Sequence, residues 1–106
     1  MQMNKYRAIR TYSELCGRCF ASRAECQRGE ELALLQRAGV ISDLEYQVRF
    51  VLSKMPRVTI TIDFTYSEDG RRVYEDAKGV LTRDFRSKMA WLEQRFGIHV
   101  VLSRRS

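Results

Sequence analysis

Apolar and polar positions alternate with a period of two along two stretches of the chain. Every second residue from Leu44 to Leu52 is apolar, and so is every second residue from Val58 to Tyr66. Alternation of this kind predicts β-strands. A third strand is expected at about 71–77. It follows the turn sequence "SEDG", so it should form a hairpin with the strand 58–66.

Two other segments have helical spacing. In the first, Ser22 is placed as an N-cap with Glu25 three residues later, the pattern of a capping box. This helix should run to Gly39, and Leu32 marks its buried side. Glu25 precedes Leu32 by seven residues, which is two helical turns. Glu25 is therefore expected on the side of the helix that faces the core.

The second helix should begin after Thr82 and end at Gly97, with apolar residues at spacings of four, three and four. A short apolar strand, "IHVVL", follows it, and then a basic tail, "SRRS". Residues 5–12 suggest a short arm or edge strand before a turn at "CGRC". The apolar stripe of the second helix consists of Phe85, Met89, Leu92 and Phe96.

This order of elements predicts an α/β (α+β) fold. The core should be a mixed sheet of about four strands flanked by helices. The last strand follows a helical crossover and is expected to lie parallel to its neighbour. The length of 106 residues suits a single domain, residues 1–106.

Composition narrows the classes of function. Charged residues make up 30% of the chain and the net charge is +6, carried mostly by arginine. Guanidinium groups suit phosphate oxygens, so a nucleic-acid partner is one interpretation, and an ordinary solvated basic surface is the other. We find no signal-peptide pattern and no apolar run long enough for a membrane span. We therefore expect a soluble, cytoplasmic protein without a membrane partner.

Three cysteines occur, Cys16, Cys19 and Cys26. An odd number without an export signal argues against a disulfide framework. A structural zinc site would need a fourth ligand, and His99 is the only imidazole in the chain. A zinc-stapled binding protein is therefore one alternative, and reduced thiols in a turn are the simpler interpretation.

Four charged residues suggest a metal-dependent site. Asp63 and Asp76 should approach each other across the predicted hairpin, with Lys78 on the same side as Asp76. Two carboxylates can bind Mg²⁺, which lowers the pKa of a bound water, and Lys78 could orient that water or stabilise charge on a phosphate. Glu25 could complete the metal site. The structural alternatives are a surface ion pair of Asp76 with Lys78 and a purely capping role for Glu25. Glu31 is the rival helix acid, but it lies closer to the flank of the helix.

The phrases "LLQRAGVISDLEYQVRF", "IDF" and "YEDAKG" resemble a family of small bacteriophage and prophage proteins of the PD-(D/E)XK nuclease superfamily. The resemblance runs from Asn4 to about residue 101, with Ile62 in place of the proline of the superfamily's name. It implies a restriction-endonuclease-like core, with Asp63 and Asp76 as the motif acids, Lys78 as the motif lysine and Glu25 as the helix acid. It also implies that Gln47 belongs to the site and that the cofactor is Mg²⁺ or Mn²⁺.

The expected function is therefore cleavage of DNA phosphodiester bonds. Phage endonuclease I and the archaeal Holliday-junction resolvases share this constellation, which suggests branched DNA as a substrate in phage DNA processing and recombination. A homodimer is a further expectation, because cutting two strands symmetrically needs two sites. Arginines such as Arg49, Arg71, Arg72 and Arg83 could hold the DNA backbone. The alternative function is a non-catalytic nucleic-acid-binding phage accessory protein that keeps the nuclease fold.

Overall fold

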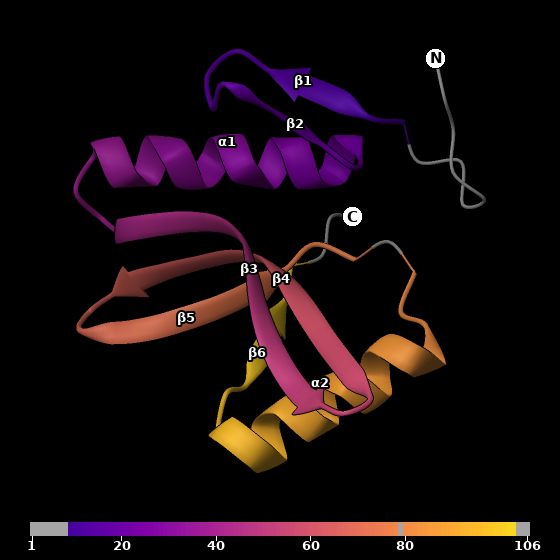
Figure 1. The fold of residues 1–106 in the computed structure, drawn as a ribbon. Coiled ribbons are helices and arrows are strands. Elements are labelled where there is room, and N and C mark those ends of the chain that lie inside the picture. Colours follow the sequence, from indigo (N-terminus) through magenta and orange to yellow (C-terminus); the bar gives the residue numbers. More distant parts are fainter. Residues whose placement is uncertain (1–8, 79, 104–106) are drawn as a thin grey trace.

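The computed structural model describes residues 9–78 and 80–103. Residues 5–8 of the expected arm and the basic tail after Ser103 lie outside the described residues. The expected order of a helix, three strands, a helix and a strand is confirmed, and a small hairpin precedes it (Figure 1). The elements are β1 (Thr11–Ser13), β2 (Arg18–Phe20), α1 (Arg23–Arg37), β3 (Ser42–Lys54), β4 (Arg57–Glu68), β5 (Arg71–Asp76), α2 (Arg83–Phe96) and β6 (Val100–Leu102).

The main sheet has four strands in the order β3-β4-β5-β6. The first two pairings are antiparallel, and β6 lies parallel to β5, as a crossover through α2 predicts. The turn between β4 and β5 is two residues long. Asp69 and Gly70 both have positive φ, 52° and 75°, as a type I′ hairpin turn requires. This turn sets the register in which Phe64 faces Glu75. The mixed sheet of an α+β fold is thus confirmed.

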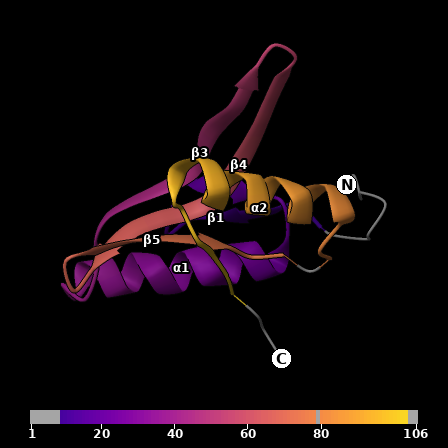
Figure 2. The same ribbon diagram turned by 90° about the horizontal axis from the view of Figure 1, so that it is seen from below.

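The two helices cover opposite sides of the sheet, and the β1–β2 hairpin packs against α1 (Figures 1 and 2). The Phe20 ring of the hairpin also packs against Tyr46 and Phe64 of the sheet. Each helix has its own apolar cluster. Leu32 of α1 packs with Phe64 and Tyr66, and Leu92 of α2 packs with Ile60 and Ile62. The two clusters therefore share β4, and its contacts change from α2 to α1 on either side of Asp63.

The centre of β4 is more buried than simple alternation suggests. Residues 62–66 are all buried, including the polar Asp63 and Thr65, which are 7% and 1% exposed. A buried carboxylate is unfavourable unless hydrogen bonds or charges compensate it. This part of the strand consequently carries polar groups that apolar packing alone does not explain.

Both helices begin and end where the sequence indicated. The side chains of Ser22 and Thr82 accept hydrogen bonds from the backbone three residues later, which is typical of N-caps. Gly39 and Gly97 have φ values of 80° and 70°, which glycine adopts more readily than other residues. Within the described residues, neither helix has the length and apolar character needed to cross a membrane.

Candidate active site

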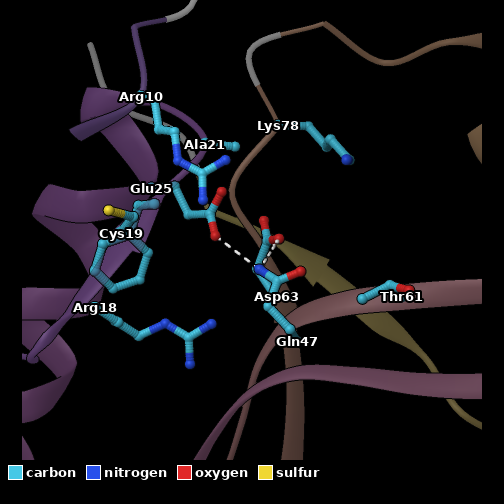
Figure 3. A pocket seen from close by; sticks show the side chains of 10 residues that line it. Arg10, Arg18, Cys19, Ala21, Glu25, Gln47, Thr61, Asp63 and Lys78 are labelled. Atoms are coloured by element: carbon cyan, nitrogen blue, oxygen red, sulfur yellow. Dashed lines mark hydrogen bonds between the residues drawn. The ribbon is translucent and has the colours of Figure 1, made fainter. Parts of the chain in front are cut away.

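One pocket of about 400 Å³ collects polar side chains from four separate segments (Figure 3). Glu25 comes from the first turn of α1, Gln47 from β3, Asp63 from β4 and Lys78 from the segment after β5. Asp76 is fully buried beneath them and contacts both Asp63 and Lys78. The structure thus brings together the five residues that the sequence placed in one site. The other residues that line the pocket are Arg10, Arg18, Cys19, Phe20, Ala21 and Thr61.

The two aspartates are linked through the backbones of adjacent strands. The N–H of Asp63 donates to Oδ1 of Asp76 at 2.8 Å, and the N–H of Ala77 donates to Oδ2 of Asp63 at 2.9 Å. Oδ2 of Asp76 is buried and accepts no hydrogen bond, and the Nζ atom of Lys78 lies 3.4 Å from it. The same Nζ lies 4.5 Å from the ring centroid of Phe85. The lysine is therefore positioned on both sides, by a carboxylate and by an aromatic ring.

Gln47 joins the helix acid to the strand acid. Its Nε2 atom donates to Oε2 of Glu25 at 2.8 Å and to Oδ1 of Asp63 at 3.1 Å. The backbone of Gln47 has a φ of 53°, the left-handed region that costs a non-glycine residue about 1 kcal/mol or more. The structure holds this residue in a costly conformation at the point where its amide bridges two carboxylates.

The crowding of carboxylates affects their titration. Burial, together with the charges of Asp63 and Asp76, raises the pKa of Glu25 to about 7. Burial and the charge of Asp63 raise the pKa of Asp76 to about 7, although Lys78 acts in the opposite direction. The site thus favours the uptake of positive charge, as protons or as a cation.

The donor set fits a hard divalent cation in part. Mg²⁺ is usually bound by one or two carboxylates and keeps several waters. Asp63 and Asp76 supply such ligands, and Oδ2 of Asp76 is buried without a hydrogen bond. However, within the described part of the chain no three carboxylate, thiol or imidazole groups are arranged to hold one metal ion together. The expectation that Asp63 and Asp76 bind a metal ion, with Glu25 completing its shell or a second site, stays a prediction, and Gln47 donates to the Glu25 carboxylate in this conformation.

The two candidates for the helix acid differ in position. Glu25 is 5% exposed and points into the pocket, whereas the Glu31 side chain is 43% exposed and pairs with Arg28. One of the two hydrogen bonds of a capping box is present, because the Ser22 hydroxyl accepts from the backbone N–H of Glu25. The Glu25 carboxylate accepts hydrogen bonds from Gln47 and from the backbone of Ala21.

The zinc alternative finds no support in the described residues. Cys19 is exposed on the pocket wall, while Cys16 and Cys26 belong to the apolar cluster around Phe20, and all three are free thiols. His99 pairs with Glu93 beyond the end of α2, at 3.2 Å. Cys16 and Cys26 thus share one cluster, whereas Cys19 and His99 lie elsewhere, and the described residues contain no group of three such ligands around one point.

The pocket arginines differ from those that the sequence suggested. Arg72 is held by Glu45, Thr65 and Ser67 and stabilises the sheet, and none of Arg49, Arg71 and Arg83 lines the pocket. Arg10 and Arg18 do line it, and sequence reasoning missed both. The only local signal was the position of Arg18 inside the C-x-x-C turn.

The comparison with protein families gives one match. The family described as "Protein of unknown function (DUF1064)" matches residues 3–103. The chain belongs to this family. No curated protein and no solved structure matches the chain.

Proposed function

We propose that the chain, residues 1–106, is a single PD-(D/E)XK-type nuclease domain. It would act as an endonuclease that hydrolyses DNA phosphodiester bonds with Mg²⁺ or Mn²⁺. The observation that carries this proposal is the pairing of Asp63 with Asp76 across adjacent strands, with Lys78 and Glu25 at the same pocket. The order α1-β3-β4-β5-α2-β6 supports it, because the resemblance to that superfamily implies a mixed sheet between helices.

Each residue has a distinct role in this proposal. Asp63 and Asp76 would hold the cation, and a bound Mg²⁺ supplies a water of lowered pKa and neutralises charge on the phosphate. The ammonium group of Lys78 stabilises negative charge on the phosphoryl oxygens. Gln47 fixes the carboxylates of Glu25 and Asp63 relative to each other. The buried Glu25 takes up or releases a proton near neutral pH.

The net charge of +6 favours DNA as the polyanionic substrate. We infer cleavage directed by DNA structure rather than by base sequence. Branched DNA, including Holliday junctions, is the substrate class that the resemblance supports, in phage DNA processing within the host cytoplasm. A homodimer would place two such sites on a symmetric junction.

The test is cleavage of supercoiled plasmid and of a four-way junction with Mg²⁺ or Mn²⁺. Asp76→Asn and Lys78→Ala should each lower the rate at least about 100-fold while DNA binding is retained. Glu31→Gln is the matched control, because it removes a carboxylate from the same helix outside the pocket, and it should retain the wild-type rate. Wild-type cleavage by both Asp76→Asn and Lys78→Ala proteins would refute the proposed site.

One observation favours the non-catalytic alternative. The amide of Gln47 satisfies Glu25 and Asp63 without a cation, and the described residues contain no preassembled three-ligand site. A nucleic-acid-binding accessory protein with the nuclease fold would show this arrangement. It predicts DNA binding without cleavage for the wild type in either metal, and the cleavage assay above separates the two functions.

A further inference from the structure

The arginines of the described chain differ in what their guanidinium groups contact. Arg28 and Arg72 are paired with the carboxylates of Glu75 and Glu45. Arg18 has no ion-pair partner within residues 9–78 and 80–103, and its Nε atom is shielded from solvent without a hydrogen bond. A shielded donor without an acceptor is unfavourable. Arg18 therefore lacks the acceptor that the paired arginines have.

The Arg18 side chain is also held in place by aromatic rings. Its Cζ atom lies 4.5 Å from the ring centroid of Tyr46 and 5.7 Å from that of Phe20. The two rings pack against each other edge-on, with centroids 5.9 Å apart. Stacking of this kind orients the guanidinium plane.

The position of Arg18 relates this cation to the candidate active site. Arg18 and Arg10 belong to the β1–β2 hairpin and the segment before it, and both line the pocket that Glu25, Gln47 and Asp63 line (Figure 3). One wall of the pocket is thus acidic and suited to a cation. The wall formed by the hairpin is basic and suited to an anion.

We infer that Arg18, assisted by Arg10, binds a DNA phosphate next to the one that is hydrolysed, and that the β1–β2 hairpin positions the substrate strand. The inference rests on the proposed function for the identity of its ligand. The planar guanidinium fork matches two phosphate oxygens, and the terminal N–H groups of Arg18, which lines the pocket, suit a phosphate that enters it. Because the acidic wall repels phosphate in the absence of a cation, the two walls would fix the direction in which the strand enters.

Binding is measured by fluorescence anisotropy with a short DNA duplex and a four-way junction in Ca²⁺, across 50–200 mM salt (order of magnitude). Arg18→Gln should weaken binding about tenfold and reduce the slope of log K against log salt by about one. Arg18→Lys keeps the charge but lacks the planar guanidinium group. Its affinity and its salt slope should therefore lie between those of the wild type and those of Arg18→Gln. Arg95→Gln is the matched control, since Arg95 also stacks on an aromatic ring, Phe96, but lies on α2 outside the pocket. Circular dichroism melts establish that each variant is folded.

A set of duplexes and junctions, each with one phosphate replaced by a neutral methylphosphonate, identifies the phosphate concerned. At one position next to the cleaved bond, the replacement should weaken wild-type binding about tenfold and leave Arg18→Gln binding unchanged. Arg10→Gln should give a smaller effect at the same position. Equal losses in Arg18→Gln and Arg95→Gln would overturn the inference, and so would a methylphosphonate effect that persists in Arg18→Gln. If wild-type protein binds DNA through Arg18 but never cleaves it, the proposed function fails and the phosphate site stands.

Discussion

The backbone N–H of Asp63 donates a hydrogen bond to the carboxylate of Asp76, with 2.8 Å between the nitrogen and Oδ1. The Asp63 carboxylate in turn accepts from the N–H of Ala77, the next residue after Asp76. Each aspartate is therefore oriented by the backbone of the other strand. The pair is rigid as long as β4 and β5 stay in register, and it brings two negative groups close together where solvent is excluded.

This proximity predicts an unusual dependence of stability on pH. The pKa values of Glu25 and Asp76 are raised from 4.5 and 3.8 to about 7. Between the ordinary pKa values and about pH 7, the folded protein keeps protons that the unfolded chain has released. The free energy of unfolding therefore falls as the pH rises. In EDTA, the melting temperature should be several degrees lower at pH 8 than at pH 5 (order of magnitude).

Two variants test the origin of that fall. Asp76→Asn removes one of the two raised groups and should melt above the wild type at pH 8, with a flatter profile. His99→Gln removes the single imidazole, and the fall should persist in this variant because Glu25 and Asp76 are still present. A wild-type melting temperature that rises from pH 5 to pH 8 would contradict the raised pKa values.

Addition of a divalent cation should reverse the loss of stability. A cation that binds the folded state alone raises the melting temperature, and protons compete with it for the same carboxylates. Mn²⁺ should therefore stabilise the wild type more at pH 8 than at pH 5. Asp63→Asn should abolish the effect, whereas Glu31→Gln should retain it. An equal shift in the Asp63→Asn protein would place the cation elsewhere.

The parts of the site that the sequence predicted depend on local rules. The two-residue turn at Asp69 and Gly70 fixes the register of β4 and β5, in which Phe64 faces Glu75. The residues next to this pair, Asp63 and Asp76, are thereby brought into contact. The placement of Glu25 follows from helical periodicity, because a residue seven positions before the buried Leu32 lies on the same side of the helix. In both cases one local pattern determines where a functional side chain points.

The parts that the sequence did not reveal depend on contacts between distant segments. Arg18 reaches the pocket because the β1–β2 hairpin packs on α1, and no periodicity in the sequence encodes that docking. The left-handed backbone of Gln47 is not encoded by periodicity either. Gln47 lies within β3, where the alternation predicts regular strand geometry. The resemblance supplied Gln47 as a site residue, but its bridge between two carboxylates required the structure.

Gly29 shows how closely α1 packs on its neighbours. A Cβ atom at this position would lie 2.7 Å from Cζ of Phe20 and 3.3 Å from Cε1 of Phe64, and both rings are buried. Gly29→Ala should therefore destabilise the protein by about 1–3 kcal/mol, although alanine favours helices by about 1 kcal/mol. Urea unfolding measures the change. Ala33→Gly, in the same helix, reports the helix propensity alone and should cost about 1 kcal/mol. A stabilised Gly29→Ala protein would show that the rings can move aside.

An ion pair joins Arg28 of α1 to Glu75 of β5, and its Glu75 side is buried. Glu75 is 2% exposed and accepts from Nε of Arg28 at 2.6 Å and from the Tyr66 hydroxyl at 2.6 Å. Burial alone would raise the pKa of Glu75, but the hydrogen bonds from Arg28 and Tyr66 outweigh it, and the pKa is lowered from 4.5. The pair therefore stabilises the fold above about pH 4.5 and loses that effect as the pH falls through the lowered pKa.

Arg28→Gln leaves the Glu75 charge without its partner and should cost about 2–4 kcal/mol at pH 7. The cost should shrink at pH 3, where Glu75 takes up a proton in the variant, and urea unfolding at the two pH values measures the difference. Arg72→Gln is the control, since its partner Glu45 is 64% exposed and such a pair contributes less than about 1 kcal/mol. Equal costs at both pH values would show that Arg28 acts through packing rather than through the charge of Glu75.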